Sequence, residues 1–302
     1  MSSIRVTTNF RDNFGTDLGT KLITKDYLMS VYPGIAQEIG KTPELWTWGM
    51  GNAGGLGNAQ ITNTSTPITT FAGGTNWRQV SSGGYHVAAI KTDGTLWIWG
   101  QGSAGKLGNA QVANILTPVT TFAGGNNWKQ VSAGNGHTVA IKTDGTLWTW
   151  GQGSNGALGN GTTIFTTSTP VTTFAGGTNW KQVDGGLDGT SAIKTDGTLW
   201  TWGSGTDGQL GNAQTTNSST PVTTFAGGTN WKQVSRGRQH TTAIKTDGTL
   251  WTWGLGSFGR LGNGLTTGRT STPVTTFAGG TNWKQVDANG SATAAIRSTD
   301  FI

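Results

Sequence analysis

The sequence predicts an all-β protein, a β-propeller of five blades with four short strands in each blade. A Trp-rich motif returns five times at a spacing near 51 residues, and four of the copies follow an Asp-Gly turn signal. The chain of 302 residues holds 51 Gly and 15 Trp but no Cys. Disordered chains are poor in aromatic residues, so this composition indicates a folded, turn-rich protein.

Two markers in constant phase define the repeat. The first, Leu-Trp-x-Trp-Gly, has its first Trp at positions 46, 97, 148, 200 and 251. The second, Trp-Lys/Arg-Gln-Val, starts at Trp77, Trp128, Trp180, Trp231 and Trp283, always 31 or 32 residues after the first. About four strands in such a period are typical of a propeller blade, whereas Gly and β-branched residues oppose helical repeats. A linear β-solenoid is the alternative, but it needs capping coils that the repeats lack.

The elements of one repeat can be assigned in chain order. Residues 90–97 place Asp93-Gly94 between two strand-like runs, which predicts a β-hairpin. In its second arm Trp97 and Trp99 point to one face and Leu96 and Ile98 to the other, so both faces should be buried. Residues 118–122 and 128–131 supply two further short strands.

The chain divides into two parts by composition. Residues 1–43 contain no Trp and no Leu-Gly-Asn, and we predict that they form an N-terminal attachment segment that anchors the chain to a larger assembly. A strap on the propeller surface is the alternative. Residues 44–302 hold the five repeats and form the predicted propeller.

The two ends of the repeat array complement each other. The array starts at residues 44–46 with the second arm of a hairpin and finishes at residues 291–297 with a first arm. We therefore expect Ala294–Arg297 to pair with Leu45–Gly49 and to close the ring with one composite blade.

The motif at Gly134–Asn160 carries a family resemblance. It combines Gly-x-x-His-Thr, the Asp-Gly hairpin, the Trp-Gly exit and a Leu-Gly-Asn turn, and it resembles the regulator-of-chromosome-condensation repeat family of β-propellers. The resemblance covers roughly residues 44–297. Relatives commonly have seven blades whereas five copies are visible here, and we favour five. The resemblance implies a recognition scaffold that contacts proteins through its faces.

Composition excludes several classes of function. Without Cys there are no disulfides, thiolate nucleophiles or Cys-ligated metals. No apolar run is long enough for a membrane-spanning helix, and the first residues lack a signal-peptide core. The formal charge is +6, and ten cations recur at two repeat positions. Charge repeated in every module predicts no clustered nucleic-acid footprint, so neither nucleic acid nor membrane insertion is expected.

The residues available for catalysis point to structural roles. His86, His137 and His240 share one repeat position, which favours bonds to nearby turns over catalysis or metal binding. The series that begins with Asp93 is typical of turn chemistry. Asp184 and Asp188 share a loop but offer too few ligands for calcium. No nucleophile stands beside a base, so we predict no enzyme, no cofactor and no metal site.

Two loops differ among the otherwise similar repeats, the one after Trp-Gly and the one before the hairpin. Binding residues commonly lie on loops held by a rigid scaffold. The unusual side chains in these loops, our candidate partner contacts, are Tyr85, Leu187, Arg236, Arg238, Phe258, Arg260 and Arg269. Arg and aromatic residues dominate interface hot spots, so these loops suit an anionic protein or glycan partner.

The leading functional hypothesis is a non-enzymatic structural or adhesion protein of a bacteriophage virion, such as a tail fibre component. It rests on the distinct segment 1–43, the Thr/Asn/Gly-rich repeats and the absence of Cys and export signals. Residues 1–43 would bind other virion proteins, and the propeller loops would bind a host-surface protein or glycan. The alternatives are a cellular, cytoplasmic protein-interaction module and a glycan-binding lectin.

Overall fold

A computed structural model describes residues 43–164 and 166–298 of the chain. The predicted attachment segment lies almost entirely outside the described residues. Within the described ranges, no helix is long and apolar enough to cross a membrane.

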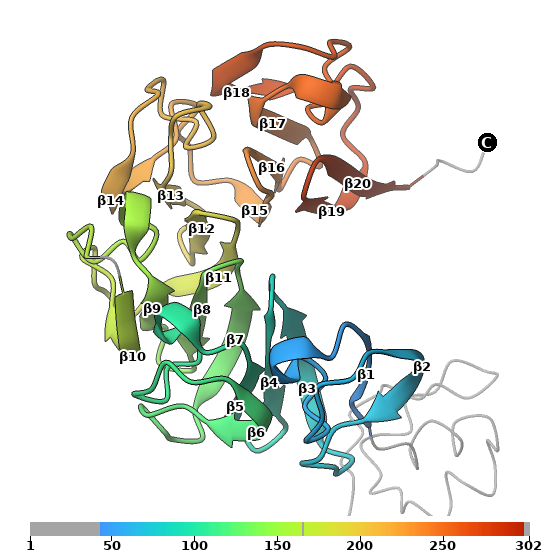
Figure 1. Ribbon diagram of the computed structural model, residues 1–302. Helices are drawn as coiled ribbons and strands as arrows, with labels where there is room; N and C mark the ends of the chain where they lie inside the picture. The colour runs from blue at the N-terminus through green and yellow to red at the C-terminus, as the bar shows by residue number, and fades with distance from the viewer. Residues whose placement is uncertain (1–42, 165, 299–302) are drawn as a thin grey trace, which may run out of the picture. The chain divides into compact units, whose positions relative to one another are not determined.

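The described residues form twenty strands and four short 3-10 helices (Figure 1). Four sheets have four antiparallel strands each, in chain order. The first sheet contains β3 (Trp77–Ser82), β4 (His86–Lys91), β5 (Leu96–Gly100) and β6 (Ile115–Thr120). The second contains β7 (Trp128–Ala133), β8 (His137–Lys142), β9 (Leu147–Gln152) and β10 (Thr166–Thr172). The third contains β11 (Trp180–Gly185), β12 (Gly189–Lys194), β13 (Leu199–Gly203) and β14 (Ser218–Thr223). The fourth contains β15 (Trp231–Arg236), β16 (His240–Lys245), β17 (Leu250–Leu255) and β18 (Arg269–Thr275).

Two further sheets have two strands each. One pairs β1 (Trp46–Gly49) with β2 (Thr64–Thr69), and the other pairs β19 (Trp283–Asn289) with β20 (Ala292–Arg297). By repeat position, β1 and β2 correspond to the third and fourth strands of a complete sheet, and β19 and β20 correspond to the first and second strands. The 3-10 helices follow third strands, at η1 (Asn52–Gly54), η2 (Ser103–Gly105), η3 (Ser154–Gly156) and η4 (Ser257–Gly259).

The pairing predicted between Ala294–Arg297 and Leu45–Gly49 is not made in this structure. Among the described strands, β20 pairs with β19 and β1 pairs with β2. Trp48 of β1 is consequently 61% exposed, whereas its equivalents Trp99, Trp150 and Trp202 are fully buried. The all-β architecture of repeated four-stranded antiparallel sheets is confirmed.

The antiparallel order gives every sheet two distinct ends. The Asp-Gly turns between second and third strands, and the connections from each fourth strand to the next sheet, lie at one end, which we call the hairpin end. The loops between first and second strands and those between third and fourth strands begin at the other, the loop end. At the hairpin end Gly145 has φ +80°, and a Cβ there would collide with the carbonyl oxygen of Thr178. This turn therefore requires glycine.

The hydrophobic cores lie between neighbouring sheets. In one core Ile90 and Ile98 of the first sheet pack with Trp128, Val131 and Trp150 of the second. Within the second sheet, the Trp128 ring meets Trp148 and Trp150 edge to face, with centroids 6.4 and 6.1 Å apart. The prediction that Trp-x-Trp forms core is confirmed in the complete sheets, although the first Trp of each pair is only partly buried.

The first strands of neighbouring sheets, which we call inner strands, are joined by a glutamine. Gln130 Nε2 donates to the carbonyl of Val183 at 3.0 Å, and the Val183 N–H donates to Gln130 Oε1 at 3.1 Å. Gln79, Gln182 and Gln233 reach the next inner strand in the same way. One side-chain amide thus satisfies a backbone donor and acceptor across each of four junctions, which fixes the spacing of the sheets.

Candidate functional site

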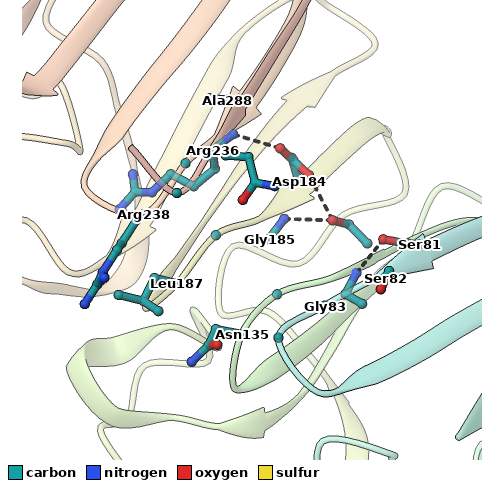
Figure 2. Close-up of a pocket in the computed structure, with 18 of the residues that line it drawn as sticks. Ser81, Ser82, Gly83, Asn135, Asp184, Gly185, Leu187, Arg236, Arg238 and Ala288 are labelled. Atoms are coloured by element: carbon teal, nitrogen blue, oxygen red, sulfur yellow. Dashed lines mark hydrogen bonds between the residues drawn. The ribbon is translucent and has the colours of Figure 1, made fainter. Parts of the chain in front are cut away.

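A cavity of about 650 Å³ opens at the loop end, where β3, β7, β11, β15 and β19 finish. Its floor is made by the fifth residue of each inner strand. These five residues are Ser81, Ser132, Asp184, Ser235 and Asp287. The rim consists of the glycine-rich loops before the second strands, and it carries Leu187 and Arg238 close together (Figure 2).

A row of hydrogen bonds runs along the floor (Figure 2). Ser132 Oγ donates to Asp184 Oδ1 at 2.9 Å, and the Arg236 N–H donates to Asp184 Oδ2 at 2.7 Å. Ser235 Oγ lies 3.1 Å from Asp184 Oδ2 and 3.3 Å from Asp287 Oδ1. The single hydroxyl proton of Ser235 can be donated to only one of these two carboxylates at a time. The other carboxylate then lacks a hydrogen bond from Ser235.

Burial raises the pKa of Asp184 to about 6, and the negative charge of Asp287 acts in the same direction. Hydrogen bonds from the Arg236 N–H, Ser132 and Ser235 oppose this rise. Asp184 is therefore partly protonated in the neutral range. Its repeat equivalents at Ser81, Ser132 and Ser235 carry no charge, which makes this side of the floor distinctive.

Arg236, a predicted partner contact, lies inside the protein. Its side chain is 3% exposed, and its guanidinium donates to the carbonyls of Gln209 at 2.7 Å and Ser204 at 2.9 Å. It also donates to Thr241 Oγ1 at 3.2 Å. Burial lowers its pKa to about 10, so the group remains charged at neutral pH. The expectation that Arg236 contacts a partner does not fit this environment, and we do not retain it.

The histidine series explains why Arg236 is buried. His86 Nε2 lies 2.7 Å from Thr138 Oγ1, and His137 Nε2 lies 2.9 Å from Thr190 Oγ1 in the next sheet. Since Thr138 Oγ1 donates to the carbonyl of Lys106, the histidine must be the donor in that pair. A structural role for histidine is confirmed, although the partner is a threonine hydroxyl of the next sheet and not a turn backbone.

The third sheet has Gly189 where the other three complete sheets have histidine, and Arg236 fills the space. A Cβ on Gly189 would lie 2.7 Å from Arg236 Nη2. The guanidinium reaches Thr241, the threonine that a histidine at position 189 would serve. The arginine at position 236 therefore takes the place of the histidine side chain that is missing at position 189.

The other predicted contacts fall into three groups. Tyr85, Leu187 and Arg238 line the cavity, with Tyr85 and Arg238 exposed. Phe258 is 82% exposed on η4, and Arg269 is exposed at the start of β18, where Nη1 donates to the carbonyl of Thr206 at 3.0 Å.

The third group is Arg260 alone, which is buried. Its Nε donates to the carbonyl of Ser257 at 2.9 Å, and its guanidinium carbon lies 5.6 Å from the Phe258 ring centroid. Arg260 therefore packs against the Phe258 ring from the protein interior, and we do not retain it as a direct partner contact.

The sequence reasoning missed the floor. Aligning the repeats on Trp-Lys/Arg-Gln-Val places Asp184 and Asp287 in one column with three serines, and that column was the available signal. The Asp93 series behaves as predicted, since Asp93 Oδ1 accepts from the Thr95 N–H at 2.9 Å and from Thr95 Oγ1 at 2.7 Å. Over the described ranges there is no group of three or more His, Cys, Asp or Glu that could hold a metal.

Removing the Arg236 side chain should destabilise the protein, and placing a histidine at position 189 should recover part of the lost stability. Arg236→Ala removes the guanidinium donor from the Ser204 carbonyl and from the Gln209 carbonyl, although Thr241 Oγ1 and Trp253 Nε1 still donate to Gln209. We expect this loss to cost about 2 kcal/mol. Gly189→His alone should also destabilise, because the imidazole meets the guanidinium. The double variant should recover at least half of the loss in chemical denaturation. A double variant no more stable than Arg236→Ala would contradict the replacement.

Asp184 should make stability depend on pH. The pKa of Asp184 is about 6 in the folded protein against 3.8 for an ordinary aspartate, so the folded state binds the proton more tightly. The contribution is fully present below pH 4 and is lost as the pH rises through 6, by about 3 kcal/mol. Asp184→Asn should remove this component. The difference in unfolding free energy between wild type and variant, measured at pH 4 and 8, should change in favour of the variant at pH 8; a constant difference would refute the assignment.

Comparison with known proteins agrees with this architecture. The model of the RCC1-like domain matches residues 39–300. The Ultraviolet-B receptor UVR8 of Arabidopsis thaliana is 32% identical over 225 residues, which cover 73% of this chain and 51% of the receptor. The human E3 ubiquitin-protein ligase HERC2 is 32% identical over 189 residues, 61% of this chain and 4% of that protein. The chain thus spans about half of UVR8 and a small part of HERC2.

Two solved structures share the fold. Human WBSCR16 superimposes with a TM-score of 0.73 at 20% identity, over 85% of this chain and 68% of that one. Prp20p from Saccharomyces cerevisiae gives a TM-score of 0.70 at 19% identity, over 85% and 65% of the two chains, and binding to Gsp1p and histones is described for it. With the family model matched across nearly all of the repeats, the predicted resemblance is confirmed, and the chain belongs to the RCC1-like domain family.

Proposed function

We propose that this chain is a non-enzymatic protein-interaction module whose partner docks on the loop end, across the cavity and the adjacent loops. Phe258 carries the proposal. It has φ 64°, a left-handed conformation that is rare and costly for a bulky residue, and its ring is 82% exposed. Its equivalents are the small residues Ala53, Ala104 and Asn155. Folding alone gives no reason to place a phenyl ring there.

The neighbouring groups suit an interface. Arg238, Leu187 and Tyr85 supply a cation, an aliphatic surface and an aromatic ring at the rim of the cavity. Arg269 adds a second cation on the same end of the fourth sheet. Aromatic residues and Arg are the side chains most enriched at interface hot spots, and two exposed Arg favour an acidic partner. The protein binding described for Prp20p supports this reading at the level of the fold.

We further propose that the domain closes into a ring of five blades, in which β19, β20, β1 and β2 form the fifth. Ring closure would bring together residues that are exposed here but whose equivalents in the complete sheets are buried. Val80 is 51% exposed, whereas Val131 and Val183, which receive a glutamine, are 1% exposed. Gln285 would be the glutamine that reaches Val80. A second cavity of about 360 Å³, lined by Trp46, Trp48 and Val80, lies where β20 would insert.

Ring closure can be tested with a pair of cysteines, because the chain has none of its own. The register Ala88↔Ile98 in the first sheet predicts that Ala294 faces Thr47. Ala294→Cys with Thr47→Cys should form an intramolecular disulfide under mild oxidation, seen as a monomer of altered mobility without reductant. Ala295→Cys with Thr47→Cys, whose side chains point to opposite faces, is the control. Exclusively intermolecular disulfides, or none, would contradict closure within one chain.

The interaction surface is tested by affinity capture, in which the immobilised full chain binds partner proteins from a lysate of the source culture. Arg238→Ala with Phe258→Ala should reduce the recovery of the bound protein at least tenfold, since hot-spot residues contribute about 2 kcal/mol each. Lys129→Ala, at the hairpin end, is the matched control and should leave recovery unchanged. Equal recovery by wild type and the double variant would exclude this surface.

The proposal for the biological setting is a bacteriophage virion, with residues 1–43 as the attachment segment. The distinct composition of that segment supports it. Mass spectrometry of density-purified particles separates this setting from a cytoplasmic interaction module. A lectin is less well supported, because Trp99, Trp150, Trp202 and Trp253 are buried and therefore offer no platform for a sugar.

A further inference from the structure

Five phenylalanines form a repeated, exposed set at the hairpin end. Each is the second residue after the last strand of its repeat, and each is 70 to 85% exposed. They are Phe71, Phe122, Phe174, Phe225 and Phe277. The backbone of each is fixed, as in Phe122, whose N–H donates to the carbonyl of Gly108 at 2.8 Å. The fold therefore holds the backbone of these residues in place while leaving their rings in water.

Two series of cations lie at the same end. The second residue of every inner strand is an exposed cation, in the series Arg78, Lys129, Lys181, Lys232 and Lys284. The last residue of every second strand is also a cation, in the series Lys91, Lys142, Lys194, Lys245 and Arg297. Lys142 Nζ lies 4.8 Å from the Trp128 ring centroid and 4.7 Å from that of Trp148, so tryptophans fix its position.

Positive charges that are spread along the sequence lie together at the hairpin end of the structure. Against these ten cations, the hairpin end of the described sheets carries five carboxylates, which are Glu44, Asp93, Asp144, Asp196 and Asp247. The excess of five positive charges is most of the formal +6 of the whole chain. The hairpin end is thus both cationic and aromatic, and the loop end, where Arg236 and Arg260 are buried, is not comparably basic.

We propose that the hairpin end adsorbs to anionic lipid bilayers. Exposed Phe rings enter the boundary between head groups and acyl chains, and Lys side chains attract anionic head groups. Each of the four complete sheets presents two cations and one Phe at this end, and neighbouring inner strands pack side by side, so the groups form a two-dimensional array. A bilayer surface matches such an array, whereas a linear polyanion meets only part of it and leaves the Phe rings in water. Adsorption of this kind requires no spanning segment, and it uses the end of the sheets opposite to the proposed protein-binding surface.

The test is flotation of the full chain with lipid vesicles at low ionic strength. Vesicles of phosphatidylcholine alone are compared with vesicles of phosphatidylcholine and phosphatidylglycerol in equal parts. We expect binding to the anionic vesicles at least tenfold stronger than to the neutral ones, and a decrease in binding as salt screens the cations. Failure to float with the anionic vesicles would overturn the proposal.

Two sets of variants separate the aromatic from the ionic contribution. Phe122→Ala, Phe174→Ala and Phe225→Ala together should weaken binding to anionic vesicles at least tenfold, and so should Lys129→Gln, Lys181→Gln and Lys232→Gln together. Phe258→Ala removes an equally exposed ring from the loop end and should leave vesicle binding unchanged. Thermal melting checks that each variant is folded.

Two results would exclude a lipid partner. One is vesicle binding that the Phe variant leaves intact. The other is tighter binding to duplex DNA than to vesicles at equal phosphate, with no effect of the Phe variant, because a nucleic acid would then be the polyanion recognised. Loss of vesicle binding with protein capture intact would leave the proposed function standing, since the two surfaces lie at opposite ends.

Discussion

The fold depends on side-chain hydrogen bonds between the inner strands of neighbouring sheets. Within each sheet the strands pair directly, whereas the inner strands of neighbouring sheets are joined by Gln130 and its equivalents. Backbone bonds at the turns, such as the Trp128 N–H donating to the carbonyl of Gly94 at 3.0 Å, add to this link. The serine or aspartate directly after Trp-Lys-Gln-Val adds a second link, as in Ser132 accepting from the Gly185 N–H at 3.0 Å. These links set the distance at which the Trp-rich cores pack, and they also form the floor of the cavity.

Variation among repeats therefore has two origins that look alike in the sequence. Phe258 and Arg238 vary at exposed positions where the scaffold imposes little. Arg236 varies just as conspicuously, yet it is buried because Gly189 vacates the space of a histidine in the neighbouring strand. An unusual side chain in one repeat can fill a space left by a smaller residue in a neighbouring repeat, as Arg236 does beside Gly189. It indicates a binding surface only where no such space exists.

Periodicity predicted what is local to one repeat. The Asp-Gly hairpin, the Trp-x-Trp strand and the strand order all follow from residues within about fifty positions of each other, and the structure confirms them. The sequence could not predict which sheet a side chain meets. The partner of His86 is Thr138, that of Arg236 is the carbonyl of Gln209, and Asp184 accepts from Ser235 of the next inner strand. For the same reason the recurring cations appeared dispersed, because only the strand directions bring them to one end.

The two ends of the sheets differ in symmetry, and that difference bears on what each can recognise. The hairpin end repeats one set of groups in each of the four complete sheets, so several weak contacts add up on a surface that has no shape of its own, as in multivalent binding. The loop end is asymmetric, with Phe258, Arg269 and Arg238 near the fourth sheet, and with Tyr85 and Leu187 as single large side chains on other sheets. Specific recognition needs a unique arrangement of anchors, which a perfect repeat cannot supply. Divergence confined to the loops gives this repeat protein such an arrangement while the strands keep the hydrogen bonds that hold the sheets together.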